Sequence, residues 1–328
     1  MLRSLILGLL VLLPCLANAD KETQVKVGVI LPLTGEFESY GELVRRAVLE
    51  NHDENIRYIF EDEGCEAKKA LSAFRKLTEI DKVKLFIGPC CGSAQQVIAP
   101  LLKKSEALAV FPTSSSTKLF EASDNRAFSS QYSIEDESAF NAKEIYRLGY
   151  RKVLLLFVEN QFSRAHEDSF REKFAGQVIE TIALSTSDSS ALKSAVLKIR
   201  AKNPDAVYVP DAAPFFSGFL SEMKKMGLSG KAVFSVYSVQ SKNILEAEGG
   251  AADGLIYSYP DIEQNEALSY FPELGARILA ANIKLCLGDT KCIRDNFERS
   301  GNFDKYGIYR SALILKQISS GKFKKFDN

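Results

Sequence analysis

The 328-residue sequence is poor in the residues and motifs that most enzyme sites need. It holds two histidines, His52 and His166, and both lie in polar, helix-like stretches typical of a protein surface. It has no HExxH pattern, no cysteine and histidine set at zinc spacing, no P-loop and no GxSxG elbow. The first apolar strand runs into LPLTG, which lacks the GxGxxG pattern of a dinucleotide site. We therefore expect no catalytic residues, no metal and no cofactor.

The sequence also lacks an excess of charge of either sign. Lys and Arg number 42, and Asp and Glu also number 42. A polyanion partner needs a basic excess, so nucleic acid is not an expected partner. Beyond the N-terminus no apolar run approaches the roughly 20 residues that span a bilayer.

The N-terminus has the three parts of a secretory signal peptide. Arg3 gives a basic start, residues 5–13 an apolar core, and Ala17-Asn18-Ala19 a small-x-small cleavage site. Lipidation at Cys15 is the alternative, but Pro14 fits that cleavage poorly. We predict a signal peptide over residues 1–19 and an exported protein of the periplasm.

Cleavage leaves 309 residues (328 minus 19) and five cysteines, which is an odd number. In an oxidising compartment disulfides persist, so one thiol should be left over.

Strand-like and helix-like runs alternate along the chain, in two successive series. Such alternation is typical of parallel strands covered on both faces by crossover helices. We predict an α/β fold with two doubly wound parallel-sheet lobes, which bind ligands at the carboxyl ends of their strands. Residues 260–274 show the least pattern, and we expect them to cross back to the first lobe. We expect residues 313–326 to form two strands joined by a turn at Ser320-Gly321. The other expected strands cover residues 24–31, 56–61, 84–88, 107–112, 152–158, 178–184, 206–209 and 232–236.

The stretch FIGPCCGSAQQVIAP places Cys90 and Cys91 on a turn between a strand and a helix. Such a pair suits a metal or redox site, a nucleophile, or a disulfide beside a binding site. Cys286 and Cys292 flank LGDTK, and without two further ligands a local disulfide is favoured over a metal. The acids Glu61-Asp62-Glu63 are interpreted as a solvated strand end.

Several motifs, taken in order, resemble the type I periplasmic binding proteins, the leucine/isoleucine/valine-binding solute receptors. They are VGVILPLTGEFESYG, FEDEGCEAKKA, FIGPCCGSAQQVIAPLL and AVFPTSSS, followed by LLLFVENQFSRA, EGGAADGLIYSYP, CLGDTKCIRD and LKQISSGKF. The resemblance covers essentially the whole chain after the signal peptide. It implies two lobes joined by three hinge crossovers and closing over a small polar ligand. We place the N-terminal lobe at residues 20–130 and 262–306, and the C-terminal lobe at 131–261 and 307–328.

The resemblance also implies how the cysteines pair. The family's first disulfide matches Cys65 and Cys91, with Cys90 left as the spare thiol; Cys90 as the partner of Cys65 is the alternative. Both positions follow neighbouring strands, so a Cα separation near 5.5 Å is reachable. Cys286 and Cys292 are expected to form the second disulfide.

In the first lobe the resemblance points to two loops that would bind a ligand. Gly92 stands where the family usually has a carboxylate-binding serine, so only its backbone N–H matches, with Ser93 as a possible substitute. The loop of Thr113, Ser114 and Ser115 matches the family's loop for the ligand amine and carboxylate. Tyr40, on the loop after the first strand, is expected to pack over the ligand or within the core.

The second lobe departs further from the family. Phe162 replaces a usual tyrosine, and Tyr237 stands near the place of the carboxylate that binds a ligand ammonium. A buried ammonium without a partner is costly. Asp211 or Glu159 would have to compensate; otherwise we expect a small carboxylate or amide with an apolar body to be preferred over leucine, isoleucine or valine.

Together these features predict a monomeric solute receptor that delivers an amino-acid-like or carboxylate ligand to the membrane permease of an ABC-type importer. An envelope sensor that uses the same fold is the alternative, and an enzyme is a third, less favoured reading. Genes for a permease and an ATPase beside this one would favour transport.

Overall fold

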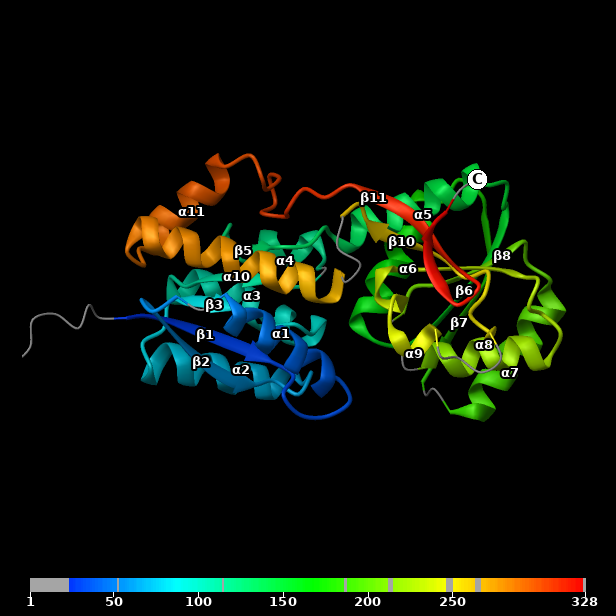
Figure 1. Ribbon diagram of the computed structural model, residues 1–328, viewed down its shortest axis with the longest axis horizontal. Coiled ribbons are helices and arrows are strands. Elements are labelled where there is room, and N and C mark those ends of the chain that lie inside the picture. The colour runs from blue at the N-terminus through cyan, green and yellow to red at the C-terminus, as the bar shows by residue number, and fades with distance from the viewer. Residues whose placement is uncertain are drawn as a thin grey trace, which may run out of the picture.

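The computed structural model has two lobes side by side, each built around one sheet (Figure 1). It describes residues 24–51, 53–113, 115–185, 188–211, 215–245, 250–262 and 267–326. The predicted signal peptide, His52 and Ser114 lie outside the described residues. No helix within these ranges is long and apolar enough to cross a membrane. The predicted α/β architecture of two lobes is confirmed.

The first lobe contains a five-stranded, wholly parallel sheet in the order β2-β1-β3-β4-β5. Its strands are β1 (Val25–Leu31), β2 (Ile56–Asp62), β3 (Leu85–Ile87), β4 (Leu108–Phe111) and β5 (Ala127–Ser129). The connecting helices are α1 (Glu38–Glu50), α2 (Ala67–Arg75) with a π-helical turn at Lys76–Ile80, α3 (Gly92–Ser105) and α4 (Thr117–Ala122). Because β1 lies between β2 and β3, the loops after these three strands converge at one edge of the sheet.

The second lobe contains a seven-stranded sheet in the order β12-β11-β10-β9-β8-β6-β7. Five strands are parallel: β6 (Lys152–Val158), β7 (Gln177–Leu184), β8 (Ala206–Val209), β9 (Ala232–Ser235) and β10 (Ile256–Pro260). The last two, β11 (Leu313–Ser319) and β12 (Lys322–Lys325), are antiparallel. The helices are α5 (Ile134–Arg147), α6 (Gln161–Lys173), α7 (Ser189–Lys202), α8 (Phe215–Lys225) and α9 (Lys242–Leu245), with a 3₁₀ turn at Tyr237–Val239.

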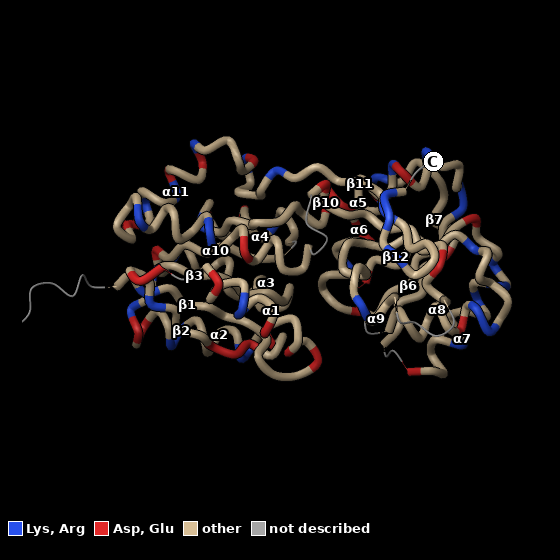
Figure 2. The backbone as a smooth tube through the Cα atoms, viewed as in Figure 1, with Lys and Arg blue, Asp and Glu red and all other residues tan. Residues whose placement is uncertain are grey.

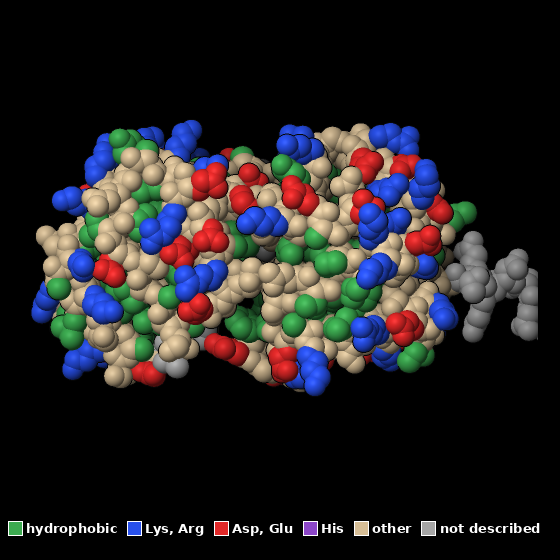
Figure 3. Space-filling view, turned by 180° about the vertical axis from the view of Figure 1, so that it is seen from behind, with side chains coloured by type: hydrophobic (Ala, Val, Ile, Leu, Met, Phe, Trp, Pro, Cys, Tyr) green, Lys and Arg blue, Asp and Glu red, His purple; other side chains and the backbone are tan. Residues whose placement is uncertain are grey.

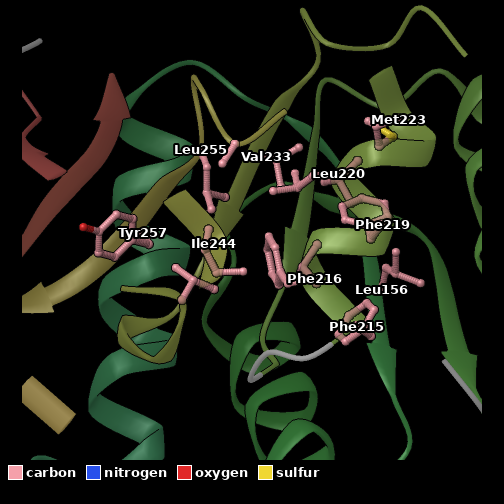
Figure 4. Packing of buried hydrophobic residues seen from close by; sticks show 14 of the residues in the cluster. Leu156, Phe215, Phe216, Phe219, Leu220, Met223, Val233, Ile244, Leu255 and Tyr257 are labelled. Atoms are coloured by element: carbon pink, nitrogen blue, oxygen red, sulfur yellow. The ribbon is translucent and has the colours of Figure 1, made fainter. Parts of the chain in front are cut away.

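Strand β6 shows why these runs form buried parallel strands. Residues Val153 to Phe157 are all fully buried, as expected for a strand covered on both faces. Leu154 and Leu156 join the core on one face, whereas Val153 and Leu155 join the core on the other. Figure 4 shows the aromatic side chains of α8 packing against the first of these faces.

Three crossovers connect the lobes: one after β5, one after β10 and one before β11. The first and third are paired, because Ser129 N donates to Gly307 O (2.9 Å) and Tyr309 N donates to Ser129 O (3.0 Å). The first also contacts the segment after the second, since Ser130 Oγ donates to Phe271 O (2.8 Å). These hydrogen bonds hold the crossovers together in one strip.

The sequence analysis did not predict the short helices α4 and α9, nor the longer helices α10 (Ala267–Cys286) and α11 (Thr290–Arg299). The stretch 260–274 does lead back to the first lobe, but α10 already begins within it. Phe271 and Leu274 pack into the core of the second lobe, whereas Leu279 and Ile283 pack into the core of the first. The buried face of α10 therefore changes partner midway along the helix, and Pro272 lies inside it, so its helical period is hard to recognise in the sequence.

The C-terminal hairpin agrees with its sequence pattern. Strands β11 and β12 pair antiparallel across Ser320-Gly321. Both turn residues have positive φ (53° and 65°), as a type I′ turn requires.

Two disulfides join Cys65 to Cys91 and Cys286 to Cys292, with Cα separations of 5.2 and 5.7 Å. These are the pairs that the resemblance implies. Cys90 is a free, buried thiol. The first disulfide ties the loop after β2 to the loop after β3, at the carboxyl edge of the sheet. The sequence analysis expected these two strands to be neighbours, but β1 lies between them, so the disulfide crosses the end of β1.

Replacing Cys65 and Cys91 together by serine should lower the free energy of unfolding by about 3 kcal/mol, because that disulfide closes a long loop in the unfolded chain. Replacing Cys286 and Cys292 by serine should lower the free energy of unfolding by about 2 kcal/mol, because the second disulfide closes a shorter loop. Urea unfolding measures both losses. Peptide mapping without reductant is the control, and a Cys65–Cys90 or Cys90–Cys91 bond would contradict the assignment.

Candidate ligand-binding site

The residues predicted to bind the ligand come from both lobes, for example Gly92 on α3 and Phe162 on α6. The space-filling view shows a hollow between the two lobes (Figure 3). Helix α3 of the first lobe begins at Gly92, directly after the disulfide. A Cβ atom at Gly92 would lie 3.4 Å from Gln161 Cγ and 3.9 Å from the backbone N of Phe162. The start of α3 therefore contacts the start of α6 across the lobes. Both helix starts carry backbone N–H groups without helical partners.

The hydroxyl groups near α3 are engaged within the first lobe. Ser93 Oγ donates to Cys65 O (2.9 Å), which ties α3 to the disulfide loop. Thr113 Oγ1 donates to Cys90 O (2.9 Å), and Ser115 Oγ donates to Gln95 Oε1 (2.9 Å). Gln95, which the sequence analysis did not single out, also donates from Nε2 to Thr113 Oγ1 (2.9 Å). The structure thus brings Ser93, Thr113 and Ser115 together around α3, and their contact with a ligand stays a prediction.

The two acids proposed as replacements for the family's carboxylate are both bonded to protein groups. Asp211 is buried, and its Oδ2 accepts from Val158 N at 2.7 Å. Glu159 is exposed, and its Oε1 pairs with Arg164 Nη2 at 2.8 Å. Asp211 therefore fastens β8 to the end of β6, and Glu159 bonds to an arginine on the solvent side.

Aromatic residues from both lobes meet between them. Burial raises the pKa of Tyr40 well above its ordinary value, and the neighbouring Cys90, Tyr237 and Glu63 raise it further. Tyr40 lies in α1 rather than on the loop after β1, and it packs against the core of the first lobe. Tyr237 is buried and packs edge-on against Tyr132 (centroids 6.0 Å apart). Phe162, half-buried on α6, packs edge-on against His166 at 4.5 Å.

Sequence analysis missed two buried carboxyl groups in this region. Glu63 is fully buried rather than part of a solvated strand end, and its Oε1 accepts from Cys90 N (3.0 Å) and Cys91 N (3.1 Å). Burial raises the pKa of Glu63 to about 8, although these two backbone hydrogen bonds act in the opposite direction. Glu63 reaches over the end of β1, because it follows β2 and binds the loop after β3.

The second buried carboxyl group is that of Glu137, in the first turn of α5. Its Oε1 accepts from Ser258 Oγ (2.6 Å), Tyr237 N (3.0 Å) and Tyr132 Oη (3.3 Å). Burial raises the pKa of Glu137 to about 7. The carboxyl group therefore lies beside the backbone of Tyr237, the residue that stands near the place of the family's carboxylate.

His166 is also buried, which corrects its interpretation as a surface residue. Its side chain is fully buried, and burial lowers its pKa to about 3. Its Nδ1 lies 2.8 Å from Ser138 Oγ, and its Nε2 lies 3.7 Å from Glu137 Oε2. His166 is therefore neutral at pH 7 and supplies no charge to Glu137. The sequence carries no pattern that would have predicted the burial of Glu137 and His166, because polar residues on amphipathic helices usually face water.

Within the described part of the chain, one group of acid and sulfur atoms resembles a metal-ligand set: Glu63, Cys65 and Cys91. The two sulfur atoms are bonded to each other, so neither is a thiolate. The arrangement therefore fits a disulfide beside a buried acid rather than a metal site.

The free energy of unfolding of the ligand-free protein should decrease as the pH rises from about 5 to 8.5. The folded-state pKa values of Glu63 and Glu137 are raised from 4.5 to about 8 and about 7. Their contribution is complete below the unfolded-state pKa and is lost as the pH rises through the folded-state values. Urea unfolding at several pH values measures this dependence. The free energy of unfolding should fall less steeply with pH in Glu63→Gln and in Glu137→Gln than in the wild type.

Glu172→Gln serves as the matched control, because that carboxylate is exposed and paired with Lys173. If both buried-site variants keep the wild-type slope, the two carboxyl groups titrate as ordinary surface acids.

Comparison with known proteins agrees with this architecture. The chain superposes on a leucine-binding protein from Thermotoga maritima with a TM-score of 0.81 and 20% identity, over 92% of this chain and 98% of that one. It superposes on a Rhodopseudomonas palustris solute-binding protein solved with 4-hydroxybenzoate with a TM-score of 0.79 and 17% identity, over 93% and 96%. It superposes on a branched-chain amino acid transporter substrate-binding protein from Streptococcus pneumoniae, solved with isoleucine, with a TM-score of 0.80 and 16% identity. That superposition covers 92% of this chain and 98% of that one. These likenesses show the fold.

Sequence comparison identifies the family. A curated relative, an amino acid binding protein of Pseudomonas aeruginosa, is 21% identical over 224 residues, which cover 63% of this chain and 59% of that protein. The family model described as periplasmic binding protein matches residues 24–276, more than half of the chain. The chain belongs to the periplasmic binding protein family.

Proposed function

We propose that this protein is an exported receptor that binds a small organic solute between its lobes and delivers it to the permease of an ABC-type importer in the membrane. The observation that carries this proposal is the contact between the starts of α3 and α6, where Gly92 faces Gln161 and Phe162. In this proposal each lobe supplies half of the site, and the paired crossovers act as the hinge. The lobes are taken as residues 20–130 with 262–306, and 131–261 with 307–328.

The ligand of the proposed receptor is amino-acid-like or a carboxylate. The N-terminal ends of α3 and α6 favour a negatively charged group through their unpaired N–H groups and their dipoles. Tyr40, Phe162 and Tyr237 give the same region an apolar, aromatic wall. Relatives of this fold were solved with isoleucine and with 4-hydroxybenzoate, which combine a carboxylate with an apolar body.

No catalytic step belongs to this proposal. Four of the cysteines are bonded in disulfides and so offer no nucleophilic thiol. The free thiol of Cys90 is buried, and burial raises its pKa, so it is not an activated nucleophile. Periplasmic location, the predicted signal peptide at residues 1–19 and a monomeric state complete the proposed receptor. A thermal-shift screen of amino acids, carboxylates, amides and aromatic acids tests it, because a ligand that binds only the folded state raises Tm. No shift with any class would contradict the proposal.

Binding of a ligand found in that screen should bring the two lobes closer together, because each lobe holds only half of the site. Small-angle scattering with and without the ligand should show a smaller radius of gyration in the complex. An unchanged radius would argue against closure about the crossovers.

Gly92→Leu should reduce ligand affinity at least ten-fold, because the larger side chain would collide with Gln161 and hold the starts of α3 and α6 apart. Gly230→Leu is the matched control, since nothing lies within 4 Å of a Cβ atom built at that position. Calorimetry measures both affinities, and thermal melting of the ligand-free proteins checks folding. Equal affinities for the two variants would place the ligand elsewhere.

A further inference from the structure

Helices α5 and α6 of the second lobe pack against one another, and their buried sides carry several polar groups. The fully buried polar side chains are Glu137, Ser138 and Asn141 on α5 and Ser163 and His166 on α6. The buried sides of helices usually carry apolar side chains, because burying a polar group without a partner is costly. A buried polar cluster that contains both an acid and a histidine therefore requires an explanation.

The two carboxyl oxygens of Glu137 have different surroundings. Its Oε1 accepts hydrogen bonds from Ser258 Oγ (2.6 Å), Tyr237 N (3.0 Å) and Tyr132 Oη (3.3 Å). These three donors occupy the lone pairs of Oε1, so this oxygen has no room for a proton of its own. Oε2 is buried and has no hydrogen-bond partner in the described chain. A proton that Glu137 binds is therefore placed on Oε2.

The imidazole ring of His166 faces this free oxygen. Its Nε2 lies 3.7 Å from Glu137 Oε2 and also has no hydrogen-bond partner among the described residues. A shift of about 1 Å would bring the two atoms to hydrogen-bond distance. The other ring nitrogen, Nδ1, lies 2.8 Å from Ser138 Oγ. Because a hydroxyl group donates or accepts by rotating, Ser138 accommodates either tautomer of the ring.

Glu137 and His166 therefore have two arrangements that differ by one proton. When Glu137 is ionised, the ring carries its proton on Nε2, directed at Oε2, and Ser138 donates to Nδ1. When Glu137 is protonated, Oε2–H is directed at Nε2, and the ring proton is on Nδ1 and is donated to Ser138 Oγ. Burial lowers the pKa of His166 to about 3, so the ring is neutral at pH 7 in both arrangements. Burial raises the pKa of Glu137 to about 7, so both arrangements are populated near neutral pH.

The groups around this pair do not add a cation to it. No Lys or Arg of the described chain forms an ion pair with Glu137. On α6 the next acid, Glu167, is already paired with Arg164 and Arg171. The phenols that face Glu137 have pKa values raised by burial, so they are neutral at pH 7. They are Tyr132 in the first crossover, Tyr208 in β8 and Tyr237 in the 3₁₀ turn.

The pair contacts both residues that the second lobe contributes to the proposed ligand wall. Glu137 Oε1 accepts from the backbone N–H of Tyr237, and the ring of Phe162 packs edge-on against His166 with centroids 4.5 Å apart. Phe162 lies in the first turn of α6, which contacts Gly92 of the other lobe. An ionised Glu137 thus places a negative charge behind this wall, where a low local dielectric strengthens its repulsion of a ligand anion.

We propose that Glu137, His166 and Ser138 form a proton-responsive group behind the ligand wall, and that an anionic ligand binds together with one proton held between Glu137 and His166. The inference rests on the proposed receptor function and deepens it, since it makes proton uptake part of carboxylate binding. The ionised Glu137 takes a proton from the buffer and becomes a neutral carboxylic acid, so the ligand carboxylate meets no like charge. A zwitterionic amino acid has no net charge, and its binding should depend less on pH.

The first test needs no ligand and no change at the pair. Nitrogen NMR of the histidine rings, in the full chain after signal-peptide removal, distinguishes a ring nitrogen that carries a proton from one that does not. His52→Gln assigns the signals, because the chain has two histidines. From about pH 5 to 9 the proton of His166 should move from Nδ1 to Nε2, with a midpoint near the Glu137 pKa of about 7. One tautomer at every pH, or a doubly protonated ring, would overturn the inference.

Two variants assign this response to Glu137. Glu137→Gln has no group that titrates in this range, so the tautomer of His166 should no longer change with pH. Glu172→Gln is the matched control on the same helix, because Glu172 is exposed and paired with Lys173, and it should keep the wild-type response. A response that persists in Glu137→Gln would contradict the inference. If that variant folds poorly, the wild-type series still decides.

The second test measures binding of benzoate, an anion with an apolar body, and of isoleucine, a zwitterion. Calorimetry should show the affinity for benzoate falling by about three-fold or more between about pH 6 and 8.5, and that for isoleucine falling less. Benzoate titrations in two buffers of different ionisation enthalpy should show net proton uptake near pH 8. Glu137→Gln should abolish this uptake, and Glu172→Gln should preserve it.

The outcomes separate this inference from the proposed function. If isoleucine or another compound binds, but benzoate fails to bind or binds without proton uptake, the receptor function stands and the inference is wrong. If no compound of any class binds, the receptor function is wrong and proton-linked binding falls with it. The NMR series still shows, in that case, whether Glu137 controls the tautomer of His166.

Discussion

The architecture depends on the direction of the parallel strands. Because all five strands of the first sheet run the same way, the segments after β1, β2 and β3 emerge at one edge. Tyr40 in α1, Glu63 in a loop and Gly92 at the start of α3 therefore lie at that edge. In the second lobe the loops after β6 and β9 bring Phe162 and Tyr237 to the facing edge. The Cys65–Cys91 disulfide then fastens two of the first-lobe loops. The position of the proposed site thus follows from strand order and does not require any one loop sequence.

Electrostatics distinguishes this site from a purely apolar one. The chain as a whole is balanced, and Figure 2 shows residues of both signs on both lobes. Between the lobes the balance is lost, because Glu63 and Glu137 are buried without a basic partner in the described chain. Burying an ionised carboxyl group without a counter-charge is costly, so its pKa rises and the group holds its proton instead. The protein keeps one such group in each lobe.

The sequence predicts the fold well because the fold depends on local patterns. Apolar runs such as residues 152–158 and the Ser320-Gly321 turn determine strands and a hairpin with little help from the rest of the chain. Helix α10 escapes prediction, since its apolar residues serve two cores in succession.

The candidate site is predicted less well, because hydrogen bonding in three dimensions decides which polar groups remain available. The hydroxyls of Thr113 and Ser115 bond to Gln95 and to backbone oxygens, and Glu159 pairs with Arg164. Glu63 and Glu137 look like surface acids in the sequence. Their burial follows from the packing of distant segments, such as Ser258 against α5, which one sequence cannot reveal.

A crystal structure of the complex with the tightest ligand from the screen tests the central claim most directly. The account predicts that the ligand lies between the starts of α3 and α6, in contact with both Gly92 and Phe162 and enclosed by both lobes. A ligand bound to one lobe alone, for instance in the surface depression lined by Gln24, Lys26 and Lys82 at the opposite edge of the first sheet, would contradict it.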